Sequence, residues 1–115
     1  MAIDLRPPRD AWELRTEQGT LRIERPLEGV VRVVASGTLH ASMSAVFVAL
    51  LDVALSAAGE GILLVWDWRA VTALDEHLRA DADRVLHAHR GRIRKCTVRV
   101  PRSCVLFDSR PSRAA

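Results

Sequence analysis

The sequence predicts an α/β fold, a small sandwich in which helices pack against a mixed, mainly parallel β-sheet. Three observations carry this prediction. Apolar and β-branched residues alternate with polar ones between residues 12 and 37, the apolar spacing becomes helical after Gly37, and the continuous apolar run GILLVW at 61–66 precedes a second helical stretch. Strands that alternate with helices favour right-handed crossovers and parallel pairs. A chain of 115 residues suits one domain with its own core.

The composition is that of a soluble globular protein, with 49% hydrophobic and 27% charged residues. Three Trp, two Phe and no Tyr are too few rings for a platform that stacks single-stranded nucleic acid. The charge is unevenly distributed: residues 90–102 carry six bases and no acid, whereas residues 75–83 carry four acids and one base. Two solvated faces of opposite charge are the simplest interpretation, and a bipolar docking surface is the sharper one. Nucleic acid is the weaker option, because no recognition motif accompanies the basic stretch.

The two ends of the chain lie outside the expected domain of residues 11–106. Residues 1–10, with Pro7 and Pro8, are expected to form a flexible arm, and residues 107–115 a disordered tail. The first residues lack a signal-peptide pattern, and Cys96 and Cys104 form no CxxC pair. We therefore expect a cytoplasmic protein with reduced thiols.

The first half of the chain predicts three strands and a helix. Residues 12–26 form two short strands around Gln18 and Gly19, and residues 29–37 form the next strand. The helix covers residues 41–58, and its apolar residues recur at helical spacing: Met43, Val46, Phe47, Leu50, Val53, Ala54 and Ala57. Asp52 and three serines interrupt this segment, which argues against a transmembrane span.

This helix is apolar around much of its circumference, since Val48, Leu51 and Leu55 lie off its main stripe. Such a helix needs cover on more than one side. Burial within the fold is the simpler interpretation. The alternative is a homodimer contact or ligand face that includes Phe47, Leu51 and Leu55.

The second half predicts a strand, a helix and a strand. The run at 61–66 is typical of a central parallel strand that is covered on both faces. It ends at Asp67, a short loop follows, and an amphipathic helix begins at about Asp75 and ends at about His89. This helix is expected to bury Leu78, Ala82, Val85, Leu86 and His89. In the last strand, 93–100, one face carries Cys96, Val98 and Val100.

No motif indicates catalysis, a metal or a cofactor. The chain has neither the Gly-x-Ser-x-Gly turn of acyl-transfer enzymes nor a glycine-rich phosphate loop. His87 and His89 are two residues apart on a helix, so their rings diverge. Asp67, Asp75 and Glu76 are the candidate paired carboxylates. We expect no enzyme, no cofactor and no metal site.

The start of the second helix has two candidate caps. Thr72 and Asp75 fit the Ser/Thr-x-x-acid pattern loosely, and Asp75 alone could cap the first turn. Acids at this end also suit the helix dipole. Capping accounts for Asp75, only partly for Glu76, and not for His77.

Two stretches resemble STAS domains, the sulfate transporter and anti-sigma factor antagonist family. The turn SGTLHASM at 36–43 resembles the Gly-x-Leu-Asp-Ala turn that ends an early strand of that family, and LLVWDWRAVTALDEHLR at 63–79 resembles its strand, Asp, loop and helix start. The likeness is closer to the SpoIIAA-like subgroup, which is related to CRAL-TRIO lipid-binding domains. It covers about residues 28–103 and is carried by Asp67, Trp68, Thr72, Asp75, His89, Arg90 and Lys95.

The resemblance implies a non-enzymatic regulatory module of bacterial signalling that docks another protein, such as a kinase or a sigma-factor regulator. Docking would use the strand-loop-helix edge at 67–79. The implied exposed patch consists of Asp75, Glu76, His77 and Arg79, with Asp67 and Thr72 fixing its geometry. The CRAL-TRIO likeness implies an alternative, the binding of a lipid or another small apolar ligand.

Two departures from the family bear on function. Glu76 and His77 stand where anti-sigma factor antagonists have serines that accept phosphate, and Glu76 would supply a permanent negative charge instead. The family's next helix is shortened or lost after Pro101. Its loss would expose apolar sheet surface or leave a site incomplete.

Overall fold

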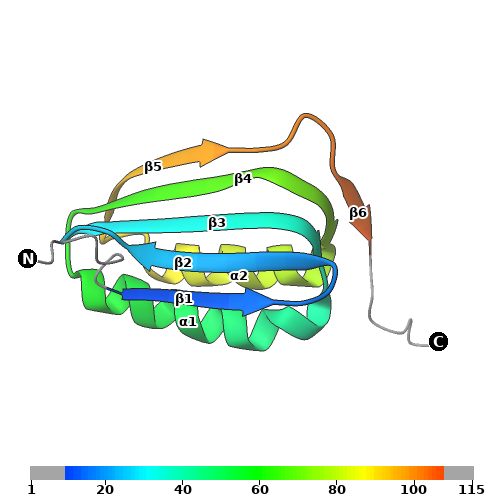
Figure 1. Ribbon diagram of the computed structural model, residues 1–115. Coiled ribbons are helices and arrows are strands. Elements are labelled where there is room, and N and C mark those ends of the chain that lie inside the picture. Colours follow the sequence, from blue (N-terminus) through cyan, green and yellow to red (C-terminus); the bar gives the residue numbers. More distant parts are fainter. Residues whose placement is uncertain (1–9, 108–115) are drawn as a thin grey trace, which may run out of the picture.

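The computed structural model describes residues 10–107, which form one mixed sheet and two helices (Figure 1). In chain order the elements are β1 (Asp10–Arg15), β2 (Gly19–Arg25), β3 (Val30–Leu39), the 3-10 turn η1 (Ala41–Met43), α1 (Ser44–Ala58), β4 (Ile62–Asp75), α2 (Glu76–Ala88), β5 (Ile93–Arg99) and β6 (Val105–Phe107). The predicted α/β class is confirmed. Asp10 and Phe107, expected in the arm and the tail, instead belong to β1 and β6. The rest of the expected arm and tail lies outside the described residues.

The sheet combines an antiparallel part with a parallel part. The strand order is β1-β2-β3-β4-β5, and β6 pairs with the far end of β4. β1, β2 and β3 are antiparallel neighbours, whereas β3, β5 and β6 all run parallel to β4. The two helices make the crossovers that parallel pairing requires. β6 was not predicted, because three residues are too few for a clear alternating pattern.

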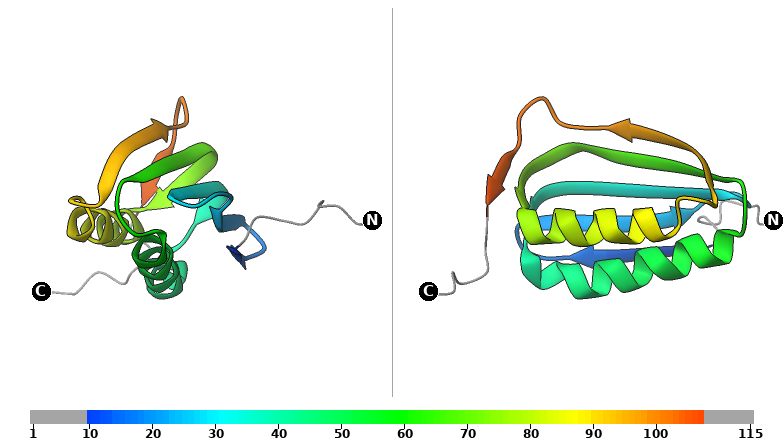
Figure 2. Two further views of the ribbon diagram at one scale, coloured as in Figure 1. Left: turned by 90° about the vertical axis from the view of Figure 1, so that its left-hand side faces the viewer. Right: turned by 180° about the vertical axis from the view of Figure 1, so that it is seen from behind.

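Both helices lie on the same face of the sheet (Figure 2). α1 packs against β2 and β3, and α2 packs against α1 and β4. Phe47, Leu51 and Leu55 are fully buried in this layer. The expectation that they form a dimer or ligand face is therefore wrong, because that side of α1 lies on the sheet. The exposed large apolar residues of α1 are Val46 and Val53, which are 49% and 52% exposed.

The segment Ala41–Ala58 has a mean hydropathy of 1.9 and is long and apolar enough, by length and composition, to cross a membrane. A core helix meets the same criteria. In this fold the buried side of the segment supplies much of the core, and Phe47 contacts the rings of Trp66 and Trp68 at 6.1 and 6.2 Å.

β4 is longer than predicted. The expected loop after Asp67 is wrong, because the strand continues to Asp75 and pairs with an extended β3. The pairing is irregular after Val34 and again after Gly37, so the alternation of apolar residues is interrupted there. Gly37 has a φ of 76°, and a Cβ at this position would lie 2.2 Å from the carbonyl oxygen of Gln18. Only glycine fits this bend.

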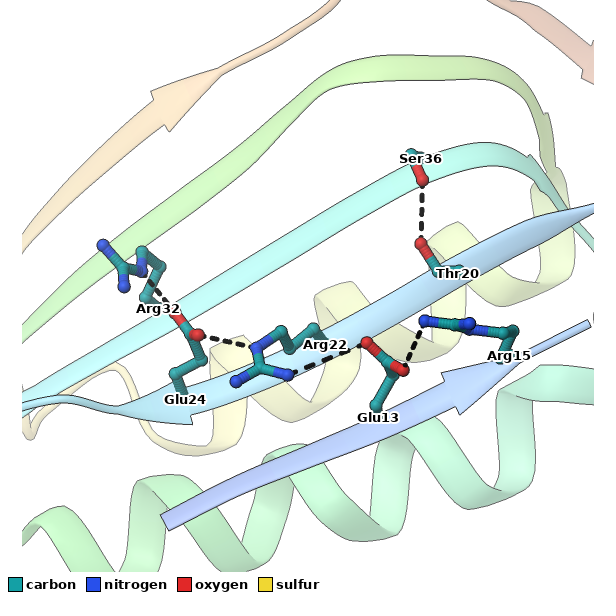
Figure 3. A network of polar contacts seen from close by, with 7 residues as sticks. All are labelled: Glu13, Arg15, Thr20, Arg22, Glu24, Arg32 and Ser36. Atoms are coloured by element: carbon teal, nitrogen blue, oxygen red, sulfur yellow. Dashed lines mark hydrogen bonds and ion pairs between the residues drawn. The ribbon is translucent and has the colours of Figure 1, made fainter. Parts of the chain in front are cut away.

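The sheet face opposite the helices carries a network of charged side chains (Figure 3). Glu24 accepts hydrogen bonds from Arg22 Nε and Arg32 Nε, both at 2.6 Å. Arg22 also lies 3.7 Å from Glu13, which binds Arg15 at 3.0 Å. Burial opposes the ionisation of Glu24 most strongly, but the hydrogen bonds from the two arginines outweigh it and the pKa lies below its ordinary value. Glu24 therefore stays ionised although its side chain is almost buried.

We predict that Glu24→Gln lowers the free energy of unfolding by about 1–2 kcal/mol at neutral pH, because two arginines lose their shared carboxylate. A carboxyl with a depressed pKa stabilises the fold above its unfolded-state pKa, and this contribution is lost as the pH falls through the folded-state value. The difference between the two proteins should therefore shrink below about pH 4.5, the ordinary Glu value. Urea denaturation at several pH values measures it. The matched control is Glu28→Gln at an exposed position, and an equal loss in both variants would contradict the role of the network.

Candidate functional site

Asp75 ends β4 and caps α2. Its Oδ1 accepts hydrogen bonds from the backbone N–H groups of His77 at 2.8 Å and Leu78 at 3.1 Å. This confirms Asp75 as the N-cap and leaves Thr72, which is exposed, outside the cap. The expectation that Asp75 is part of an exposed patch is wrong. A capping carboxylate turns back toward the first helical turn, and here it is fully buried.

The other members of the expected patch remain at the surface. Glu76 is exposed, His77 is half-buried, and the Arg79 side chain is 57% exposed. Arg79 Nε lies 4.0 Å from Asp83, at the limit of an ion pair. Nothing in the geometry tests whether Glu76, His77 and Arg79 bind a partner, so that role stays a prediction.

Asp67 does not join the start of α2. Its carboxylate is bound by Arg69 Nε and Nη2, both at 2.9 Å, and these hydrogen bonds hold its pKa below the ordinary value. Asp67 and Asp75 are eight residues apart on one strand, which at about 3.3 Å per residue separates them by roughly 26 Å. Asp67 therefore cannot form a carboxylate pair with Asp75 or Glu76. It also lies too far away to position their side chains directly.

A groove with a mainly apolar lining lies beside α2, with a cavity volume of about 400 Å³. We call it the α2–β5 groove. Its floor and walls come from four parts of the chain: Trp66, Trp68, Val71 and Leu74 of β4; Arg79, Ala82, Asp83 and Leu86 of α2; Cys96, Val98 and Val100 in and just after β5; and Pro101, Cys104 and Leu106 in and before β6. Arg79 is thus shared between the expected patch and the groove.

The groove exists because neither helix covers β5. Cys96 pairs with Leu64 and Val98 with Trp66, so these β5 side chains lie on the helix-bearing face of the sheet. Their predicted common face is confirmed, but it is open: Val98 is 55% exposed and Val100 64%. The rings of Trp66 and Trp68 stack at 4.7 Å behind them. The result is an apolar surface that folding leaves in contact with water.

Two polar features complete the groove. The indole Nε1 of Trp68 is buried and has no hydrogen-bond partner in the part of the chain that the structure describes. A buried donor of this kind normally has an acceptor. The thiols of Cys96 and Cys104 are free, and burial raises the pKa of both above the ordinary value. Both thiols are therefore protonated at neutral pH and are poor nucleophiles.

Two of the four histidines, His87 and His89, are engaged outside the groove. His89 Nε2 lies 2.7 Å from Asp52 on α1, and His87 Nε2 lies 2.7 Å from Arg90. Over residues 10–107, no three His, Cys, Asp or Glu side chains are grouped so that they could hold a metal ion. The groove is thus suited to contact with an apolar surface.

Comparisons with known proteins add no relative: no family model matches the chain, and no curated protein or solved structure matches it either.

The α2–β5 groove was missed at the level of sequence. The available signals were the apolar face at 96, 98 and 100 and the lack of a third helical stretch to cover it.

We predict that Asp75→Ala lowers the free energy of unfolding by about 1–2 kcal/mol, because two N–H groups of the first turn lose their acceptor. The neighbouring Glu76→Ala should change it by less than about 0.5 kcal/mol, since Glu76 is exposed. Chemical denaturation of both variants measures the difference. Similar losses in the two variants would show that the cap is not what stabilises this end of α2.

Proposed function

We propose that the protein is a non-catalytic module that binds another protein through the α2–β5 groove. One observation carries the proposal, the exposed apolar surface of Val98, Val100 and Leu106 on the sheet face that the helices otherwise cover. Leu106 is 46% exposed. Contiguous apolar patches on soluble proteins commonly mark interaction sites. This docking surface adjoins the edge at 67–79 and shares Arg79 with it.

We propose further that the module is of the STAS type, within the SpoIIAA-like subgroup, and acts in the cytoplasm in bacterial regulation. The sequence likeness at 36–43 and 63–79 supports this, and so does the placement of helices on one face of a mixed sheet. The free thiols of Cys96 and Cys104 suit a reducing compartment. A kinase or a sigma-factor regulator is the kind of partner that the resemblance suggests. Glu76 then supplies a constant negative charge where the family carries a phosphorylated serine.

The binding of a small apolar ligand is a second candidate, favoured by the unpartnered Nε1 of Trp68 in the wall of the groove. Its cavity volume of about 400 Å³ falls within the range of small-molecule sites. Such a ligand would carry an acceptor oxygen on an apolar body. Mass spectrometry of the folded, purified protein distinguishes the candidates, because a retained ligand adds a defined mass that denaturation removes.

One prediction of the proposed function concerns partner binding in the groove. A photoreactive amino acid at position 100 should cross-link a partner protein in the native host, and Val98→Asp in the same chain should abolish that adduct. The matched control places the photoreactive residue at Val53, which is exposed to a similar degree on α1. The same adducts from positions 100 and 53, or an adduct insensitive to Val98→Asp, would contradict docking in the groove.

The second prediction concerns the start of α2. The double variant Glu76→Lys, Arg79→Glu should weaken partner binding about tenfold, because it inverts the charges beside the groove. Its melting temperature should change little, since both side chains are exposed and Arg79 has only a marginal ion pair. The affinity of each variant for the partner protein that cross-linking identifies tests the loss of binding. Thermal denaturation tests the unchanged melting temperature. A large fall in melting temperature would show that the charges are structural.

A further inference from the structure

We infer that the occupant of the α2–β5 groove is an amphipathic α-helix of the partner protein, with acidic residues along the side that faces β5. This inference rests on the proposed function and deepens it, because it names the shape and the charge of what binds. Three features support it: the width of the open surface, the stripe that α2 presents to it, and the bases around β5.

The helical layer ends before β5. α1 packs against β2 and β3, α2 lies beside it toward β4, and no helix formed by residues 10–107 lies over β5 (Figure 2). A helix with its side chains is about 10 Å wide and neighbouring strands are about 4.8 Å apart, so one helix covers about two strands. The next place in the helical layer therefore lies over β4 and β5. Cys96, Val98 and Val100 point into it.

α2 presents a helix-packing stripe to this place. Arg79, Ala82, Asp83 and Leu86 line the groove and are spaced at i, i+3, i+4 and i+7. This spacing forms the ridge by which one helix packs against another. A helix laid in an apolar groove is a common mode of peptide recognition.

The charges around β5 select an acidic occupant. Arg94, near the start of β5, and Arg102, just after its end, are exposed, and no ion pair of theirs occurs within residues 10–107. The acids that line the groove are limited to Asp83, which lies on the opposite wall beside Arg79. Long basic side chains along β5 can reach over an adjacent helix, and acidic residues on that side of it would be attracted to them.

A second copy of this chain fits the groove poorly. The exposed apolar face of α1, around Val46 and Val53, has Asp52 as its sole acid, and that acid binds His89. Insertion of the α1 face of one copy into the groove of the next would join two different surfaces. Such a contact repeats from copy to copy and forms a filament unless it closes into a ring. Pairing of two β5 edges would bring the bases of both copies together, which natural edge strands use to prevent such pairing.

The test uses three synthetic helices of about 18 residues, enough for five turns. One carries leucines along one face and glutamates on both flanks; the second has lysines in place of the glutamates; the third has the composition of the first in scrambled order. Binding to the full chain is followed by the fluorescence of Trp66 and Trp68, which lie in the groove, and by calorimetry. We expect the glutamate helix to bind at least about tenfold more tightly than the lysine helix, with the difference shrinking in high salt.

Variants locate the binding. Val98→Asp should abolish binding of the glutamate helix, and Val53→Asp on the exposed face of α1 should leave it unchanged. Val98→Thr is the milder variant if the aspartate disturbs folding, as judged by circular dichroism, and should weaken binding severalfold.

Each contrary result has its own meaning. Equal binding of the lysine helix would overturn the acidic assignment, and no binding of any helix would overturn the helical one. In both cases the groove-dependent cross-link to a protein would remain, so the proposed function would survive. Binding to vesicles of phosphatidylglycerol, abolished by Val98→Asp in the absence of helix binding, would replace the helix by a membrane. Binding that is insensitive to Val98 would overturn the inference and remove the groove from the proposed function.

Discussion

The width of a helix relative to the spacing of strands governs this structure. A helix about 10 Å wide spans about two strands that lie about 4.8 Å apart, and here the two helices pack on β2, β3 and β4. α1 and α2 lie side by side and pack through Phe47 and Leu78 into the core beneath them. The sheet extends beyond them through β5 and β6. The α2–β5 groove is the direct consequence, and it forms the proposed docking surface.

The two faces of the sheet differ in how fully their side chains are paired or covered. On the outer face, charged residues partner one another across strands, as Glu24 does with Arg22 and Arg32 (Figure 3). On the inner face, Leu21 and Val33 are fully covered, whereas Val98 and Val100 are not. A fold that left both faces of β5 without partners would be prone to aggregation. Here bases occupy the outer face and the edge of β5, and they oppose pairing with another strand while leaving the inner face available.

The sequence predicts those features that depend on local pattern. The helical spacing of Phe47, Leu50 and Ala54 predicts α1, and the position of Asp75 before an amphipathic stretch predicts the cap of α2. The alternation at 96, 98 and 100 predicts their common face. The extension of β4 past Asp67 was missed because β4 carries extra residues between Asp67 and Ala70 and between Val71 and Ala73, which interrupt the alternation that marks a strand.

Features that depend on how elements are placed relative to one another could not be read from pattern. Periodicity shows that Val98 and Val100 share a face, but it does not show whether a helix lies over them. It also shows that Phe47 lies on an apolar side of α1, but not that this side meets the sheet. The burial of Asp75 follows from the closeness of its carboxylate to the first turn of α2, within 3.1 Å of Leu78 N. The packing of α1 and α2 against β2, β3 and β4 shows that the inner face of β5 stays open.

The most direct test of the docking surface is an amide ¹H–¹⁵N NMR titration of the full chain with the free partner protein that cross-linking identifies. The account predicts that the largest chemical-shift changes fall on β5, β6, the second half of β4 and the face of α2 from Arg79 to Leu86. The outer face of the sheet and the exposed face of α1 should remain unchanged. Changes centred on Val46 and Val53, or on the charged network around Glu24, would contradict the claim that the groove beside α2 is where this protein binds.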